Sequence, residues 1–277
     1  MDKNLHEIGF IGTGNMGKSL IKGVLKSGLY KQDDIIATDK QNNILEYLSR
    51  EFGISTTNSN IELTKKTKVL ILCVKPQNMK EVLIDIRDVL TDSHLIISIA
   101  AGISIRAITK TIMKDLAVIR VMPNTPALVQ KGMSGIAYGK YVKEEHKRIV
   151  LDIFNSIGKT IVVKEDMIDL ITAISGSGPG YIFRIMECMV CSAKKMGLDE
   201  KSAKKLVIQT FIGSSYLANE SKESLSTLRK MVTSPKGTTE AGLSVFEKAN
   251  IMNIIHNAIK AAYEKSIEIK KEWEKEA

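Results

Sequence analysis

EIGFIGTGNMGKSL, at residues 7–20, decides the fold of this chain. A short apolar, β-rich run leads into Gly12, Gly14 and Gly17, and a helical pattern follows. In that context G-x-G-x-x-G predicts a dinucleotide-binding turn. Gly12 is expected to make the tight turn, Gly14 to let a pyrophosphate approach the backbone, and Gly17 to let helix and strand pack closely. The pyrophosphate then lies at a helix N-terminus, which favours anions.

Other residues near this turn are expected to contribute to the same cofactor site. Asn15 and Met16 lie between the last two glycines. Asp39 ends the second β-rich run, where a carboxylate can bond the ribose 2′-hydroxyl of NAD. Thr38, Lys40 and Asn60 are alternatives that suit a 2′-phosphate, and Asp39 also fits a plain turn residue. The choice between NADH and NADPH stays open.

Short β-rich runs alternate with helical patterns up to about residue 163. The runs lie at 7–12, 34–38, 68–74, 94–100 and 117–122, and the helical patterns at 16–27, 43–51, 79–90, 105–114 and 143–156. This alternation predicts a parallel sheet built from βαβ units. Two further runs, 134–139 and 159–164, are candidates to extend its edge.

After Glu165 the strand signal disappears and long helical patterns follow. They cover 166–174, 179–196, 199–219, 223–231, 238–248 and 250–272. The pattern at 179–196 is apolar almost all round, so it needs cover on every side, and a second subunit is the natural source. The last stretch, EKSIEIKKEWEKEA at 264–277, is expected to be a solvated, fraying helix. We therefore predict an α/β chain: a Rossmann-type dinucleotide-binding domain (1–163) followed by an all-α dimerisation domain (164–277).

Composition narrows the class of protein. Hydrophobic residues make up 44% and charged residues 26%, which is ordinary for a globular protein. The net charge of +9 comes from dispersed lysines, and only 5% of residues are aromatic, so nucleic-acid binding is not expected. No apolar run approaches the roughly 20 residues of a membrane span, and the N-terminus lacks a secretion signal. With three cysteines and no disulfide framework, we expect a cytoplasmic protein.

Residues for the common acid–base and metal chemistries are missing from the motifs. The four histidines, His6, His94, His146 and His256, all lie away from the glycine-rich loops. Cys188 and Cys191 form C-x-x-C inside an apolar helix, where core packing is expected, and no cluster has metal-ligand spacing. A hydroxy-acid dehydrogenase needs a base for the hydroxyl proton. Reduction of a C=N bond fits better, because an iminium is already electrophilic.

A substrate carboxylate would then need an anion site, and VTSPKGTTE at 232–240 provides a candidate. Pro235 and Gly237 break a helical pattern there and are flanked by hydroxyls, with Gly237 supplying backbone freedom. An ordinary N-cap and turn is the alternative interpretation. Free N–H groups around Gly237 and Thr238, where the next helix begins, would suit a carboxylate.

Six motifs, in order and over nearly the whole chain, carry a family resemblance. They are GFIGTGNMG, VKP, SIAAGIS, MPNTPALV, ISGSGPGYIF and VTSPKGTTEAGL. The chain resembles pyrroline-5-carboxylate reductases, which pass hydride from NAD(P)H to Δ1-pyrroline-5-carboxylate and so make proline. The resemblance implies a Rossmann domain, a helical domain that interlocks in a homodimer that is often assembled further, and an active site between the nucleotide domain and the dimer's helices.

The resemblance also implies roles for residues of this sequence. Ser234, Gly237, Thr238 and Thr239 would hold the substrate, with Thr239 orienting the ring nitrogen and serving as the candidate catalytic residue. The implied cofactor contacts are Val74, Lys75, Pro76, Ala100, Ala101, Asn124 and Pro179. Two residues depart from the family pattern: Lys236 and Gly180 stand where glycine and alanine are usual.

Two other functions are weighed. A β-hydroxyacid dehydrogenase shares the domain arrangement but has a catalytic lysine where this chain has Ile182, counted from Gly176. A protein that senses NAD(P)H without turnover would not need the carboxylate loop.

Overall fold

The computed structural model describes residues 5–276 and divides into two compact units. Unit 1 comprises the chain up to Ser177 together with the residues from Ala262 onward, and unit 2 comprises Gly178–Ala261. The predicted boundary between residues 163 and 164 stays a prediction. Within residues 5–276, no helix combines the length and apolar character needed to cross a membrane.

Unit 1 is built on one eight-stranded sheet in the order β3-β2-β1-β4-β5-β6-β7-β8. The strands are β1 Ile8–Ile11, β2 Ile35–Thr38, β3 Ser55–Thr57, β4 Val69–Leu72, β5 Leu95–Ser98, β6 Ala117–Met122, β7 Gly132–Tyr138 and β8 Gly158–Val162. Neighbouring strands are parallel except for β7, which runs antiparallel to β6. The order 3-2-1-4-5-6 is that of a Rossmann sheet, which confirms the predicted fold. β7 and β8 extend its edge, as expected.

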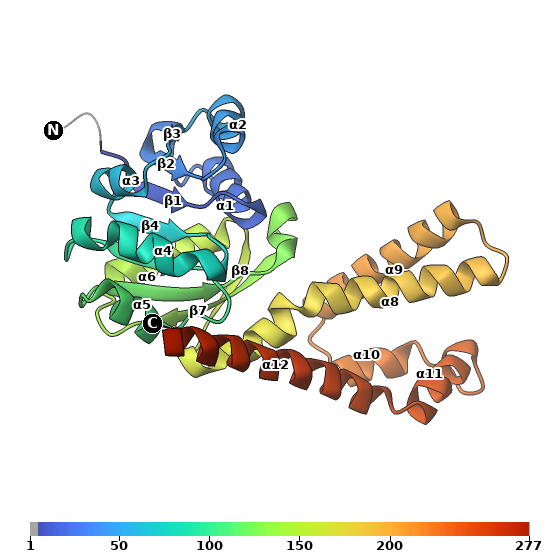
Figure 1. Cartoon of the computed structure of the whole chain (residues 1–277). Helices are drawn as coiled ribbons and strands as arrows, with labels where there is room; N and C mark the ends of the chain where they lie inside the picture. The colour runs from blue at the N-terminus through green and yellow to red at the C-terminus, as the bar shows by residue number, and fades with distance from the viewer. Residues whose placement is uncertain (1–4, 277) are drawn as a thin grey trace. The chain divides into compact units, whose positions relative to one another are not determined.

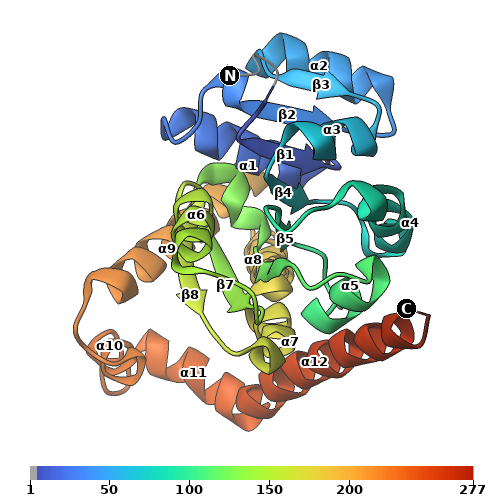
Figure 2. The ribbon, with the colours of Figure 1, turned by 90° about the vertical axis from the view of Figure 1, so that its left-hand side faces the viewer.

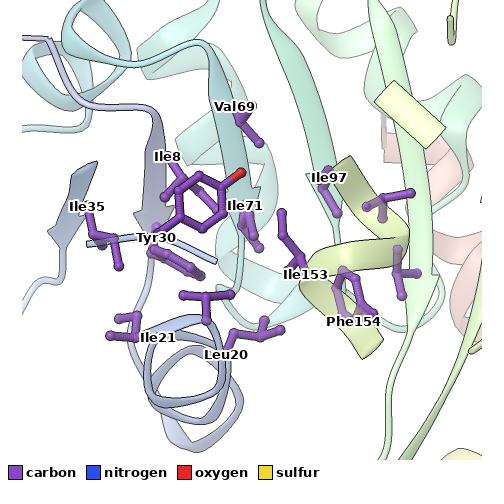
Figure 3. Packing of buried hydrophobic residues seen from close by; sticks show 14 of the residues in the cluster. Ile8, Leu20, Ile21, Tyr30, Ile35, Val69, Ile71, Ile97, Ile153 and Phe154 are labelled. Atoms are coloured by element: carbon purple, nitrogen blue, oxygen red, sulfur yellow. The ribbon is translucent and has the colours of Figure 1, made fainter. Parts of the chain in front are cut away.

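Helices cover both faces of this sheet (Figures 1 and 2). They are α1 Asn15–Lys26, α2 Asn42–Phe52, α3 Asn60–Lys66, α4 Pro76–Ile86, α5 Ile105–Ile112 and α6 Glu144–Asn155. The central strands are buried on both faces, which explains their continuous apolar runs. Figure 3 shows one face, where Leu20 and Ile21 of α1 and Ile153 and Phe154 of α6 pack with Ile71 in a single cluster.

The second face holds another buried cluster, beneath α4 and α5. Met79 and Leu83 from α4 and Ile108 from α5 belong to it, together with Leu70 of β4. Trp273, near the end of the chain, also belongs to this cluster. Unit 1 is therefore completed by residues from the far end of the sequence.

Unit 2 is entirely helical. It contains α8 Gly178–Lys195, α9 Glu200–Glu220, α10 Leu225–Met231, α11 Thr238–Lys248 and the first turns of α12 Ile251–Glu276. α8 and α9 run side by side as a helical hairpin (Figure 1). No residue of α8 is buried within the chain. Phe183, for example, is 63% exposed, so this helix has an unpartnered apolar surface.

Three local predictions need correction. β3 and α3 were not predicted, because β3 has only three residues, all polar, and α3 only seven. The continuous helix expected at 166–174 is interrupted: α7 covers only Ile168–Ile171, and a π-helical turn follows at Thr172–Gly176. The N–H of Ser177 donates to the Thr172 carbonyl at 2.8 Å, the wider spacing that defines such a turn.

The expectation of a solvated, fraying C-terminal helix is wrong. α12 continues to Glu276, and its last turns belong to unit 1. Ser266 and Trp273 are only 5% and 8% exposed. These positions lie on one helical face together with Ile269 and Lys270. Apart from Ile267, the remaining positions are lysines and glutamates, so the sequence conceals how much of this face is buried.

Candidate active site

The glycine turn has the tight turn predicted at Gly12 and the close packing predicted at Gly17. Gly12 has φ +84°, in the left-handed region. A Cβ on Gly17 would lie 2.8 Å from the Gly12 carbonyl oxygen, so the helix packs directly on the turn. Around Gly14 the space is open, with no heavy atom within 4 Å of a Cβ placed there. Gly14 also starts α1 without a side-chain cap, which leaves the N–H groups at Asn15, Met16 and Gly17 for an anion.

Asp39 holds this turn in place. One of its carboxylate oxygens accepts hydrogen bonds from both the backbone N–H and the hydroxyl of Thr13, each at 2.9 Å. The other accepts from the N–H of Gln41 at 3.1 Å. Thr13 itself is fully buried. The carboxylate therefore ties the end of β2 to the glycine turn and still leaves a negative charge beside the predicted ribose position.

The cationic and amide groups near Asp39 are already engaged with acidic residues of α4. Lys40 Nζ lies 2.8 Å from Glu81 Oε2, in an exposed pair. Asn60 Nδ2 donates to Asp85 Oδ2 at 3.0 Å. Exposed pairs of this kind contribute little free energy and exchange partners readily.

Asp39, Lys40 and Asn60 line one pocket of about 400 Å³ at the carboxyl ends of β1, β2 and β4. Of the predicted cofactor residues, the pocket brings together Gly12, Gly14, Thr38, Asp39, Lys40, Asn60, Val74 and Lys75. Cys73 lines it too, and burial raises the pKa of its thiol far above the ordinary range, so it stays neutral. A strand-end pocket beside a glycine turn and an uncapped helix start fits a dinucleotide.

The remaining predicted cofactor residues of unit 1 follow neighbouring strands. Pro76 is the first residue of α4, directly after β4 and its loop. Ala100 and Ala101 follow β5, and Asn124 follows β6. Since these strands are parallel, all three loops lie at the same edge of the sheet.

Asn124 uses its side chain to hold this edge together. Its amide nitrogen donates to the carbonyl and the hydroxyl oxygen of Ser175, at 3.2 and 3.1 Å. Its amide oxygen accepts from the N–H of Met133 at 2.8 Å. The side chain thereby joins the loop after β6 to β7 and to the π-helical turn.

The predicted substrate loop lies in unit 2, where α11 begins. Ser234, Thr238 and Thr239 are exposed, and within residues 5–276 their hydroxyls form no hydrogen bond. The N–H of Gly237 donates to the Ser234 carbonyl at 2.9 Å, so it is occupied by the turn itself. The donors that remain at the start of the helix are those of Thr238, Thr239 and Glu240, because the N–H of Ala241 is the first to reach back, to the Gly237 carbonyl.

The backbone of this loop differs from the expectation at one position. Gly237 has φ −88°, so it does not need glycine's conformational freedom, whereas Lys236 adopts φ +58°. Gly237 is required by close packing, because a Cβ there would lie 2.9 Å from the Ser234 carbonyl oxygen. Lys236 is held in its left-handed conformation by its N–H, which donates to Glu240 Oε2 at 2.7 Å.

Pro179 also belongs to unit 2, in the first turn of α8. A Cβ on the neighbouring Gly180 would meet open space, so the alanine usual in the family would fit here.

The histidines and the C-x-x-C pair lie elsewhere. His6, His94 and His146 line a pocket of about 930 Å³ where the strands begin, away from the glycine turn. His94 is buried and bonded to Thr91 and to the Thr64 carbonyl, a structural role. Cys188 and Cys191 are exposed free thiols, so the core packing expected for them does not occur within the single chain.

Sequence reasoning missed several residues that shape the site. Thr13 was not expected to lock Asp39, and Glu81 and Asp85 were not expected to engage Lys40 and Asn60. Thr13 is the residue between the first two glycines, and the motif accepts any residue type there, so the sequence gives no sign of its role. Glu81 and Asp85 lie four positions apart on one face of α4. Only the folded structure shows that this face meets Lys40, after β2, and Asn60, at the start of α3.

Comparison with known proteins agrees with this arrangement. Residues 165–269 match the family model "Pyrroline-5-carboxylate reductase dimerisation", and residues 7–102 match "NADP oxidoreductase coenzyme F420-dependent". A pyrroline-5-carboxylate reductase of Methanosarcina acetivorans is 38% identical, over 96% of this chain and 98% of the relative.

Two solved structures are similar over nearly the whole chain. One is a pyrroline-5-carboxylate reductase from Coxiella burnetii, with 35% identity, TM-score 0.90 and coverage of 96% of this chain and 99% of that one. The other is a Plasmodium falciparum pyrroline carboxylate reductase with NADP bound, with 32% identity, TM-score 0.87 and coverage of 97% and 99%. This chain belongs to the pyrroline-5-carboxylate reductase family.

Proposed function

We propose that the chain reduces Δ1-pyrroline-5-carboxylate to L-proline, the last step of proline biosynthesis, with NADPH or NADH. The observation that carries the proposal is the start of α11. Exposed hydroxyls of Ser234, Thr238 and Thr239 surround free N–H groups at a helix N-terminus. Such a site binds a carboxylate without arginine, and the hydroxyls suit the ring nitrogen beside it.

In this proposal each unit binds a different part of the reacting system. In unit 1, the glycine turn and the loops after β4, β5 and β6 hold the dinucleotide, whose reduced nicotinamide supplies the hydride. In unit 2, Ser234 and the N–H groups of Thr238 and Thr239 bind the carboxylate. Thr239 orients the ring nitrogen; its own pKa is far from neutral, so water supplies the proton that the product amine takes up.

We also propose that the protein works as a homodimer in the cytoplasm, with further assembly of dimers. The apolar surface of α8 and the match to a dimerisation family model support the homodimer. The free thiols of all three cysteines are in keeping with a reducing compartment.

Single hydroxyl deletions test the substrate loop. Ser234→Ala and Thr239→Ala should each cost about 1.5–3 kcal/mol of transition-state binding, the range for hydrogen bonds to charged groups. The loss should appear in kcat/KM for the imine, with cofactor affinity nearly intact. Ser244→Ala is the matched control, because that hydroxyl lies on the same helix but donates to the Ala241 carbonyl.

The control Ser244→Ala should leave kcat/KM within about twofold of the wild type. If Ser234→Ala and Thr239→Ala do the same, the loop at the start of α11 does not bind the substrate.

A further inference from the structure

The last turns of α12 lie against the part of unit 1 that carries the predicted cofactor loops after β4 and β5. Ser266, Ile269, Lys270 and Trp273 recur at intervals of three or four residues and so share one face. Trp273 is 8% exposed, although its neighbours in sequence are charged. We call residues 266–274 the C-terminal brace.

Trp273 connects the brace to the loop after β4. Its indole belongs to the same buried cluster as Met79 and Val82 of α4. Its Nε1 donates to the Pro76 carbonyl oxygen at 3.4 Å, a long hydrogen bond. Pro76 immediately follows Val74 and Lys75, which line the dinucleotide pocket. The position where α4 begins is therefore set in part by an indole from the other end of the chain.

Ile269 connects the brace to the loop after β5. Gly102 has φ +74°, and a Cβ on it would lie only 2.4 Å from Ile269 Cγ2. The brace therefore approaches the backbone that directly follows Ala100 and Ala101. Ser104, two residues further on, donates its hydroxyl to Glu274 Oε1 at 2.9 Å.

A buried polar cluster fixes the register of the brace. Asp169 Oδ1 accepts from Ser266 Oγ at 3.0 Å and from Arg120 Nη2 at 2.9 Å. Asp169 Oδ2 accepts from Lys270 Nζ at 3.2 Å. Arg120 and Asp169 are each 1% exposed and pair with each other, so a shift of α12 by one residue would take Ser266 and Lys270 away from this buried carboxylate.

We propose that the C-terminal brace is a positioning element for the cofactor. Trp273 and Ile269 are positioning residues: they act through the loops at 74–76 and 100–102. Holding both loops in place before the cofactor arrives lowers the ordering cost of binding. The inference rests on the proposed assignment of these loops to the dinucleotide. It predicts that damage to the brace weakens cofactor binding and leaves imine binding nearly unchanged.

Three variants and a control test the brace. Trp273→Leu and Ile269→Ala remove packing, Trp273→Phe removes only the N–H donor, and Lys271→Ala changes an exposed position of the same helix. The Kd for NADPH and the KM values for both substrates are measured on the full-length protein. Trp273→Leu and Ile269→Ala should raise the Kd for NADPH about fivefold, and Trp273→Phe about twofold. The KM for the imine and all values for Lys271→Ala should stay within about twofold of the wild type.

Amide hydrogen exchange separates local support from general stability. In Trp273→Leu, exchange should accelerate in residues 74–78 and 100–104, while the central strand β4 keeps its wild-type protection. Unchanged NADPH affinity and unchanged exchange in these loops overturn the proposal. A parallel loss of imine affinity, cofactor affinity and β4 protection also overturns the proposal, because it would show that the variant is destabilised as a whole. A wild-type protein that binds NADPH but does not reduce the imine would refute the proposed function and leave the brace intact.

Discussion

At the scale of single residues, Asp39 has a structural role and is predicted to have a selective one as well. Its carboxylate is held by Thr13 and Gln41. The glycine-turn pattern predicts that it lies next to the position where NADP carries its extra phosphate. A negative charge there repels a 2′-phosphate by about 1 kcal/mol in a solvated site. Lys40, the nearby cation, is already paired with Glu81.

Asp39→Asn should therefore shift the preference toward NADPH. The amide oxygen still accepts from Thr13, so the tie to the glycine turn is retained, whereas the charge and the hydrogen bond from the Gln41 N–H are removed. The ratio of kcat/KM with NADPH to that with NADH should rise about fivefold. Thr13→Val is the control, since it removes one hydrogen bond and keeps the charge: it should impair both cofactors and leave the ratio unchanged. If Asp39→Asn leaves the ratio unchanged as well, the carboxylate does not act on the ribose.

Individual residues show where sequence reasoning succeeds. The roles of Gly12 and Gly17 could be predicted, because the turn and the packing are local consequences of the spacing. The left-handed backbone of Lys236 could not, because its stabilising contact with Glu240 forms only once α11 exists. The contact between Thr13 and Asp39 joins residues 26 apart, and no local pattern marks it.

At the scale of elements, the strands and most helices can be predicted from periodicity. The packing of the last turns of α12 in unit 1 cannot. Its charged residues indicate a solvated surface, and that is true of every face but one. Arg120 and Asp169 are buried together although 49 positions separate them in the chain. From the sequence alone, the two residues look like ordinary surface charges, because only the folded structure brings them together.

The buried cluster predicts a specific acid dependence. Burial alone would raise the pKa of Asp169, but the charge and hydrogen bond of Arg120, with Lys270 and Ser266, lower it. A carboxyl whose pKa is lower in the folded state stabilises the protein above its unfolded pKa, about 3.9, and loses that contribution as the pH falls through the folded pKa. The free energy of unfolding should therefore drop as the pH falls below about 4.

Asp169→Asn should lose this part of the pH dependence. At neutral pH it should be less stable by about 3 kcal/mol, the lower end for a broken buried pair, because buried Arg120 keeps only the Glu165 carboxylate, 3.8 Å away. Urea unfolding at a series of pH values measures both effects, with the exposed Asp92→Asn as control. Equal stability of Asp169→Asn and the wild type at neutral pH would show that the cluster is not a stabilising ion pair.

At the scale of the whole molecule, unit 2 has more apolar surface than a single chain can cover. Phe183, Met189, Ile212 and Tyr216 are among its exposed residues, from 42% to 68%. Exposed apolar patches of this kind usually mark interfaces. The homodimer proposed here would bury them.

Met189→Glu or Phe183→Glu should prevent that association, because a charge buried without a partner is costly. We expect loss of solubility, or monomers with little activity, in light scattering and activity assays at working concentration. Lys201→Glu, at an exposed polar position of α9, should stay dimeric and active. A wild-type protein that is monomeric and fully active at that concentration would contradict the interface.

The most direct test of the central claim is the stoichiometry of the reaction. Purified wild-type protein is incubated with NADPH and Δ1-pyrroline-5-carboxylate, and both cofactor oxidation and proline are measured. Hydride goes to the imine carbon and a proton to the nitrogen, so one L-proline should form for each NADPH oxidised. Imine-independent NADPH oxidation, absence of proline, or reduction of NADP⁺ by a β-hydroxyacid in place of imine reduction would contradict the account.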